Sequence, residues 1–143
     1  MEKEIVKEVD VDKFINLAKE ELKKIKEISP PEWAKYSKTG SHRKYPPHLE
    51  DWWYIRAASI LRKIQLRQPL GVSRLRTYYG GRKERGHKPE RFRRAGGSNI
   101  RKILQQLEKA GFVTTKKDGL KRGRILTEKG QQFIRKIASE AKK

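Results

Sequence analysis

The sequence predicts a mostly helical fold that carries one small β-hairpin, and three observations support this prediction. Apolar residues recur at helical spacing in several separate segments. Near the C-terminus, two short runs that suit β-strands flank Asp118-Gly119, a dipeptide typical of tight turns. The length of 143 residues suits one domain with its own hydrophobic core. We therefore expect a single domain that covers residues 1–143.

The first predicted helix begins near the N-terminus. Asp10 is a suitable N-cap, because its carboxylate can accept a hydrogen bond from a backbone N–H of the first turn. The helix must end before Pro30-Pro31, since proline restricts the residue before it and cannot donate a backbone hydrogen bond. Its apolar residues share one helical face and are Val11, Phe14, Ile15, Ala18, Leu22 and Ile25. A polar connection then leads to Pro46-Pro47.

Residues 50–67 form the most apolar predicted helix, and we expect it at the centre of the fold. A helix that is apolar over a wide arc has other elements packed around it. Two adjacent stripes are apolar, one with Trp53, Ala57, Ile60 and Ile64, the other with Tyr54, Ala58 and Leu61. The remaining stripe carries Arg56, Lys63 and Arg67, and Arg62 flanks it.

A basic segment follows the central helix. A short helix is expected from about Val72, closed by Gly80-Gly81, and one of Tyr78 and Tyr79 should pack in the core while the other can face a partner. Residues 80–94 then hold seven cations among fifteen residues, and only Phe92 could anchor in a core. The cations are Arg82, Lys83, Arg85, Lys88, Arg91, Arg93 and Arg94. We expect a loop that becomes ordered on binding a polyanion.

The C-terminal part is predicted to contain two helices with the hairpin between them. Ser98 is the expected N-cap of a helix over 98–110, and Gly111 ends it. Its inward residues are Ile100, Ile103, Leu104 and Leu107, and its outward residues are Asn99, Arg101, Lys102, Gln105 and Gln106. The last helix has one apolar face, made of Phe133, Ile134, Ile137 and Ala138.

The hairpin is predicted to pair Phe112–Lys117 with Arg124–Thr127, and its connecting loop is basic through Lys121 and Arg122. The resulting order is helix, short helix, helix, hairpin, helix. This is the order of a winged helix, a helix-turn-helix followed by a β-hairpin wing, here with extra helices before it. In that arrangement the helix over 98–110 takes the place of the recognition helix.

The charge of the chain is large and unevenly distributed. The formal net charge is +20 and the isoelectric point is about 10.4. Residues 1–30 carry seven Lys or Arg and eight Asp or Glu, whereas residues 31–143 carry thirty and nine. Positive charge of this size is costly unless an anionic partner neutralises it. A nucleic-acid backbone does so, and binding is driven by the counterions that it releases.

Several classes of protein are excluded by what the sequence lacks. It has no cysteine, hence no disulfide framework and no thiolate metal site. It has no apolar run long enough for a membrane span and no signal-peptide stretch at its start. Its three histidines, His42, His48 and His87, lie in polar loops without metal-ligand spacing. No nucleophile motif or phosphate-binding glycine loop is recognisable, so we expect neither an enzyme nor a cofactor.

Five short motifs resemble one ribosomal family. They are Trp-Trp-Tyr-Ile-Arg-Ala-Ala-Ser at 52–59, Tyr-Gly-Gly-Arg at 79–82, Leu-Gln-Gln-Leu-Glu at 104–108, Leu-Thr-Glu-Lys-Gly at 126–130 and Pro-Glu-Trp at 31–33. The sequence is similar in these motifs to the archaeal and eukaryotic small-subunit ribosomal protein numbered nineteen, of the type absent from bacteria. The resemblance extends from about Val9 to Ala138. The second tryptophan, Trp53, and the basic insertion from Leu120 to Arg122 depart modestly from the family pattern.

The resemblance implies a helical protein with a small hairpin in the head of the small subunit, and a role in maturing precursor small-subunit RNA. It maps the basic helix face of the family onto Arg56 and Arg62, its glycine loop onto Arg82, and a later helix cation onto Arg101. The expected partners are small-subunit ribosomal RNA and neighbouring ribosomal proteins in the cytoplasm, with no membrane. We also expect a monomer off the ribosome, and the lysine-rich composition favours an archaeal source.

We predict an RNA-binding surface made of sixteen cations, and the simpler interpretation of each is a solvated charged residue. They are Arg56, Arg62, Lys63, Arg67, Arg82, Lys83, Arg85, Lys88, Arg91, Arg93, Arg94, Arg101, Lys102, Lys121, Arg122 and Arg124. The alternative function is a winged-helix DNA-binding regulator or chromatin protein, which would concentrate its cations on the helix over 98–110 and on the wing and would dimerise. An RNA-processing enzyme is more remote, since no catalytic set is visible. Trp33, Trp52, Trp53, Tyr54 and Phe112 are expected in the core rather than stacked on bases.

Overall fold

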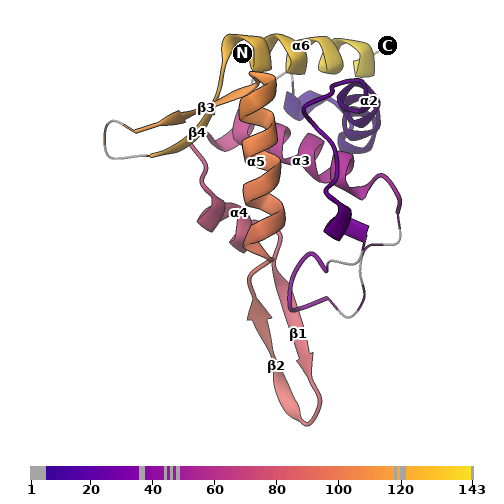
Figure 1. Cartoon of the computed structure of the whole chain (residues 1–143), viewed down its shortest axis with the longest axis vertical. Helices are drawn as coiled ribbons and strands as arrows, with labels where there is room; N and C mark the ends of the chain where they lie inside the picture. Colours follow the sequence, from indigo (N-terminus) through magenta and orange to yellow (C-terminus); the bar gives the residue numbers. More distant parts are fainter. Residues whose placement is uncertain are drawn as a thin grey trace.

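The computed structural model describes residues 6–35, 38–43, 45, 47, 49–117, 119 and 122–142. Its helices are α2 (Val11–Lys23), α3 (Trp52–Arg67), α4 (Val72–Tyr78), α5 (Gly97–Ala110) and α6 (Glu128–Lys142), with a short 3₁₀ helix η1 (Glu32–Lys35). Its strands are β1 (Gly81–Arg85), β2 (Lys88–Arg93), β3 (Val113–Lys116) and β4 (Gly123–Leu126). The prediction of a mostly helical fold with a small hairpin is confirmed, and a second hairpin accompanies it (Figure 1).

Helix α3 is the centre of the hydrophobic core. Both of its predicted apolar stripes face inward, and Trp53, Ala57, Ile60 and Ile64 are fully buried. Helices α2, α5 and α6 pack around it (Figure 1). The tryptophans cluster at its start, where the ring of Trp53 makes edge-on contacts with Trp33 and Trp52. The expectation of a core position is right for Trp53 and Phe112, but Trp33 remains 42% exposed.

Helix α2 follows the sequence prediction closely. The Asp10 carboxylate accepts a hydrogen bond of 3.1 Å from the backbone N–H of Asp12, so Asp10 is the N-cap. Phe14, Ala18 and Leu22 are buried, as expected for the inward face. Val11 was predicted on that face but is 40% exposed.

Helix α5 differs from the prediction at its start and on its outer face. It begins at Gly97 with Gly96 as N-cap, one residue before the expected start, and Ser98 makes no capping bond. The N–H of Gly96 donates to the carbonyl of Thr39 at 2.7 Å, which fixes the turn into the helix. Asn99 and Gln106 were expected outside but are buried, because tertiary packing covers both ends of that face. Gly111 ends the helix in the left-handed conformation (φ 88°), as predicted.

Residues 81–93 form an antiparallel β-hairpin, so the prediction of a loop is wrong. Lys83 lies opposite Arg91, and Arg85 opposite Lys88. The turn is Gly86-His87, and Gly86 has a φ of 69°, as two-residue hairpin turns with glycine first require. The strands escaped prediction because they show no alternation of apolar and polar residues. Phe92 does not anchor in the core, since it is 52% exposed.

The second hairpin, β3–β4, is the predicted one. Val113 pairs with Leu126 and Lys116 with Gly123. Backbone hydrogen bonds in both directions join Leu70 to Arg124, at 3.1 and 2.7 Å, and so attach β4 to the connection between α3 and α4. The predicted turn residue Asp118 and the loop cation Lys121 lie outside the described residues. Within the described part of the chain, none of the helices has the length and apolar character needed to span a membrane.

Candidate nucleic-acid interface

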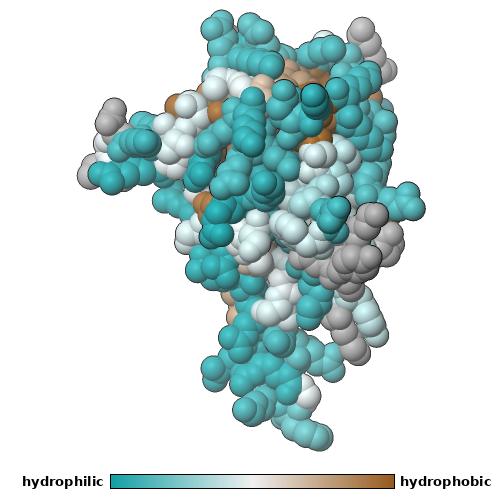
Figure 2. All heavy atoms as spheres, in the orientation of Figure 1, coloured by the Kyte–Doolittle hydropathy of each residue, from teal (hydrophilic) through white to brown (hydrophobic). Residues whose placement is uncertain are grey.

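The β1–β2 hairpin projects away from the helices and carries most of the cations predicted between residues 80 and 94 (Figure 1). Its surface is hydrophilic in the view of Figure 2. Lys88, Arg91 and Arg93 are exposed, while Lys83 and Arg85 are half-buried. The register places Lys83 opposite Arg91 and Arg85 opposite Lys88, and like charges directly opposite destabilise a strand pair. The hairpin therefore gains stability from any anion that lies along it.

Acidic side chains compensate little of this charge. Residues 80–94 contain two acids, Glu84 and Glu90, against seven cations. The Glu90 carboxylate lies 4.0 Å from the Arg82 guanidinium, and Arg82 is largely exposed. An exposed pair of this kind contributes little to stability. The hairpin thus keeps a strong net positive charge in water.

The base of the hairpin is fixed to the helices by a set of hydrogen bonds. The Arg94 guanidinium donates to the carbonyl and the hydroxyl of Ser73, at 2.9 and 2.7 Å. The Arg76 Nε donates to the carbonyl of Ala95 at 2.8 Å, and the N–H of Ala95 donates back to the carbonyl of Arg76 at 2.9 Å. The hairpin and α4 are therefore joined on both sides of Ala95, which is fully buried.

His42 lies beneath the start of the hairpin, close to Gly81. Burial lowers the pKa of its imidazole, and the nearby charges of Arg43 and Arg56 lower this pKa further. Both ring nitrogens are enclosed and have no hydrogen-bond partner among the described residues. Around it is a shallow cleft of about 560 Å³, whose lining residues include Lys38, Arg43, Arg82 and Lys83. A neutral His42 avoids adding a further positive charge to this cleft.

The predicted basic stripe of α3 is only partly open to solvent. The Arg56 guanidinium lies 3.9 Å from the centre of the Tyr79 ring, and burial lowers the pKa of Arg56. The Tyr79 hydroxyl is hydrogen-bonded to Ser59 at 2.6 Å, so Tyr79 is the tyrosine that packs inward. Arg62 is half-buried, and within the described part of the chain its Nε has no hydrogen-bond partner. Within this basic stripe Arg67 is exposed to solvent, whereas Arg56 and Lys63 are half-buried.

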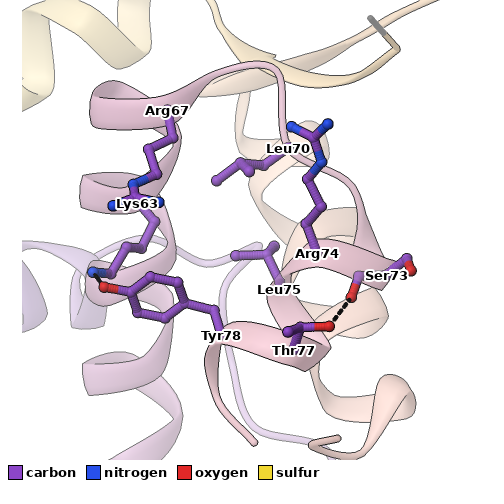
Figure 3. Close-up of a pocket in the computed structure, with 8 residues that line it drawn as sticks. All are labelled: Lys63, Arg67, Leu70, Ser73, Arg74, Leu75, Thr77 and Tyr78. Atoms are coloured by element: carbon purple, nitrogen blue, oxygen red, sulfur yellow. Dashed lines mark hydrogen bonds between the residues drawn. The ribbon is translucent and has the colours of Figure 1, made fainter.

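Lys63, Arg67 and Tyr78 belong to a pocket of about 430 Å³ between α3 and α4 (Figure 3). Tyr78 is 47% exposed and points toward α3, where the Lys63 ammonium lies 3.6 Å from the centre of its ring. The ammonium also hydrogen-bonds the Tyr78 hydroxyl. Burial lowers the pKa of Lys63, and the charges of Arg62 and Arg67 lower it further.

The cations of α5 and of the β3–β4 hairpin differ in their exposure to solvent and in their ion pairing. Arg101 and Lys102 are exposed on α5, and Arg122 is exposed beside β4. Arg124 is instead half-buried, and its Nε donates to the Glu108 carboxylate at 3.1 Å. Glu108 also accepts a hydrogen bond from Thr115 at 2.8 Å, so this pair joins α5 to both strands.

Several charges at the opposite end of the molecule are paired. Lys19 lies 2.8 Å from Asp51, which lowers the pKa of that carboxyl group. Lys142 lies 3.0 Å from Glu8, and Lys24 lies 3.3 Å from Glu21. The α2 side is therefore close to neutral, as its composition predicts, whereas little of the charge on the β1–β2 hairpin is paired.

Sequence reasoning missed several cations that the structure places beside the predicted ones. Arg74 lies in the pocket across from Arg67 (Figure 3). Lys38 and Arg43 line the cleft beside His42. The signal for Arg74 was its place in Ser-Arg-Leu-Arg, where Leu75 is inward and its neighbours must face out. Lys38 and Arg43 are brought to the hairpin by the bridge between Gly40 and Ala95, which no local pattern indicates.

Across the described residues, no three or more His, Cys, Asp and Glu side chains gather as metal ligands.

The sequence matches the family described as "Ribosomal protein S19e" over residues 5–143. A relative named small ribosomal subunit protein eS19, from Aeropyrum pernix, is 49% identical over 93% of this chain and 86% of its own length. The protein eS19G of Ascaris suum is 42% identical over 94% of this chain and 90% of its own length. The protein eS19B of Schizosaccharomyces pombe is 41% identical, over 93% and 91% respectively.

Proposed function

This chain belongs to the ribosomal protein S19e family, and from that premise we propose that it is a structural constituent of the small ribosomal subunit that binds ribosomal RNA. The family consists of ribosomal structural proteins and not of enzymes. The place of action is then the cytoplasmic ribosome, and an archaeal source agrees with the archaeal relative at 49% identity. The finer proposal is a position in the head of the subunit, with a role in assembly and in maturing precursor RNA.

One observation carries the RNA-binding proposal. The β1–β2 hairpin places Lys83 opposite Arg91 and Arg85 opposite Lys88, and it extends away from the helices (Figure 1). Such a strand pair is under electrostatic strain until phosphates lie along it. Neutralisation of several phosphates at once releases counterions and so favours binding. The hairpin is therefore the principal RNA-binding element in this proposal.

The mechanism is electrostatic and architectural. The hairpin contacts RNA from one side. Other contacts come from Arg67 on α3, from Arg101 and Lys102 on α5, and from Arg122 beside the second hairpin. The core around Trp53 holds these groups at fixed separations. In this proposal Arg56 and Arg124 act indirectly, because Tyr79 and Glu108 already engage them. The protein thus holds separate RNA segments in one geometry, as a single domain that is monomeric off the ribosome.

A winged-helix DNA-binding regulator is the second candidate. The elements α3, α4, α5, β3, β4 and α6 follow in the order that a winged helix requires, with the β1–β2 hairpin inserted between α4 and α5, and this arrangement is part of our proposal for the fold. A DNA-binding function would use α5 and the β3–β4 hairpin. Arg124 there is engaged by Glu108, but Arg101, Lys102 and Arg122 are exposed, and the inserted β1–β2 hairpin adds further exposed cations outside this unit. The family relationship, together with these additional cations, favours the ribosomal function.

Sedimentation of the tagged protein from cell lysate tests the proposal. Wild type should migrate with the small subunit and remain there after a moderate-salt wash. A variant with Arg91→Glu and Arg93→Glu should be lost from the subunit. The control, Lys13→Glu with Lys26→Glu, makes the same change of charge at exposed positions on the α2 side and should be retained. Migration of wild type with chromosomal DNA, or as a free dimer, would overturn the proposal and favour the DNA-binding regulator.

A further inference from the structure

The pocket between α3 and α4 combines apolar, aromatic and basic side chains (Figure 3). We propose that it accepts one unpaired nucleotide turned out of an RNA helix, and this proposal rests on the proposed function. The base stacks on the Tyr78 ring, beside Leu70 and Leu75, and Arg67 and Arg74 bind its phosphate. The remaining lining residues are Lys63, Ser73 and Thr77.

The size and the apolar part of the pocket fit a base. Its volume of about 430 Å³ lies within the range of pockets that hold small organic ligands. Leu70 and Leu75 line the pocket but belong to the hydrophobic core, at 6% and 1% exposure, so the apolar surface open to a ligand is chiefly the Tyr78 ring, which is 47% exposed. A phosphate alone would make no use of this ring, whereas a base can stack on it.

Tyr78 supplies an aromatic wall that is already oriented. The Lys63 ammonium lies over its ring and hydrogen-bonds its hydroxyl, and the Tyr79 ring makes an edge-on contact at 5.6 Å between centres. These contacts hold the exposed ring in one orientation, so little side-chain freedom is lost on binding. An ammonium group has three donors, and Lys63 therefore retains donors for the carbonyl oxygen or ring nitrogen of a base.

The charges of the pocket select for an anion. Arg67 projects from α3 and Arg74 from α4, on opposite sides of the opening (Figure 3). None of the eight described residues that line the pocket is acidic. A guanidinium group can donate two parallel hydrogen bonds to a phosphate, which fixes the position of the nucleotide as well as its charge.

The pocket is also continuous with the basic hairpin. Ser73, which lines the pocket, accepts both hydrogen bonds of Arg94 at the base of the hairpin, at 2.9 and 2.7 Å. An RNA strand that lies along the hairpin would therefore pass close to the pocket. This continuity favours a nucleotide of the bound RNA over a free metabolite or a peptide.

Two RNAs distinguish the pocket from the hairpin. Both are the same stem-loop, and one has a single bulged nucleotide that the other lacks. Wild type should prefer the bulged RNA, and Tyr78→Ala should reduce this preference by about 5- to 150-fold, the range that corresponds to one stacked base. Tyr78→Phe keeps the ring and should keep most of the preference. Tyr45→Ala, at a more exposed tyrosine outside the pocket, should leave it unchanged.

A second variant, Arg74→Gln, keeps the test valid if Tyr78→Ala fails to fold, and it should lower the same preference. Equal binding of the two RNAs by wild type, or a preference that survives both variants, would overturn the pocket and leave the hairpin proposal intact. Failure of wild type to bind either RNA would overturn the proposed function and the pocket with it.

In native small subunits, ultraviolet crosslinking should join a nucleotide to Tyr78, whereas a crosslink from Tyr78 to a protein segment would contradict the inference.

Discussion

The indole Nε1 of Trp53 donates a hydrogen bond of 2.9 Å to Oε1 of Gln106, and both side chains are buried. The amide nitrogen of Gln106 in turn donates to the carbonyl of Ser29 at 2.7 Å. One glutamine therefore connects the central helix α3, the helix α5 and the segment that follows α2. The connection fixes the angle between helices that present Arg67 on one side and Arg101 on another.

The first prediction concerns this connection. Gln106→Leu should keep the volume of the side chain but leave the Trp53 N–H and the Ser29 carbonyl without partners. The Trp53 N–H is buried, whereas Ser29 is exposed and its carbonyl can bind water, so one unsatisfied buried group remains and the free energy of unfolding should fall by about 1–3 kcal/mol. Urea denaturation followed by circular dichroism measures this. Gln105→Leu, one position along and exposed, is the control and should change stability by less than about 0.5 kcal/mol.

The second prediction separates stability from RNA binding on α3. Arg56→Ala removes the guanidinium from the face of Tyr79, a contact worth about 1–2 kcal/mol when partly desolvated. The free energy of unfolding should fall by that amount in the absence of RNA. Arg67→Ala is the matched change at an exposed arginine of the same helix, and it should weaken RNA binding with little effect on stability. Equal stability of the two variants would contradict a packing role for Arg56.

The sequence predicted the elements that bury apolar residues and failed where tertiary contacts decide. The face of α2 that contains Phe14, Ala18 and Leu22 was recognised because helical spacing is a local property. The β1–β2 hairpin was not recognised, since its strands bury no apolar face and only Gly86 indicates a turn. Burial of Gln106 was missed as well, because a polar residue is buried only where a partner such as Trp53 lies nearby.

The candidate site was predictable as a set of residues but not as an arrangement. Basic composition alone identified Arg91 and Arg93 on the hairpin. It did not separate them from Arg124, whose ion pair with Glu108 depends on the strand pairing. Nor did it place Arg74 across a pocket from Arg67, because the angle between α3 and α4 is not a local property of the chain.

The third prediction is a salt dependence. If Arg91 and Arg93 each neutralise one phosphate, replacing both by Gln should reduce the slope of log K against log salt by about 1.4–1.8. Fluorescence anisotropy with a fragment of small-subunit RNA, titrated between about 50 and 200 mM KCl, measures the slope. The control variant, Lys13→Gln with Lys26→Gln on the α2 side, should keep the wild-type slope. An unchanged slope in the hairpin variant would show that these arginines do not contact phosphates.

The fourth prediction is a pH dependence that originates at His42. Its pKa is lowered in the folded protein, chiefly by burial, from an unfolded value of about 6.5. The unfolded chain therefore binds the proton more tightly, and stability rises with pH in this range. The contribution of His42 to the free energy of unfolding should be fully present above about pH 7. It should fall as the pH drops through the pKa of His42 in the unfolded chain toward its pKa in the folded protein.

Arg43 and Arg56 are the charged neighbours that oppose protonation of His42, together with its burial. His42→Gln removes the titrating group, so the variant should show a shallower loss of stability between about pH 7 and 5 than wild type. Urea denaturation at several pH values gives the comparison. Parallel curves for the two proteins would assign the pH dependence to other groups.

The fifth prediction concerns Gly80, at the base of the β1–β2 hairpin. A Cβ atom at this position would lie 2.4 Å from the carbonyl oxygen of Arg93 and 2.8 Å from the Phe92 ring. The first contact is with backbone, so Gly80→Ala must push the two strands apart at the base of the hairpin. The helical core does not depend on that contact, and circular dichroism should show its helices intact. The hairpin should become sensitive to trypsin at its Lys and Arg residues, and RNA affinity should fall with it.

Gly71→Ala is the matched control, because a Cβ there meets nothing within 4 Å, and it should leave both measurements unchanged. A Gly80→Ala protein with wild-type RNA affinity and trypsin resistance would show that the fixed base of the hairpin is not what presents its cations to RNA.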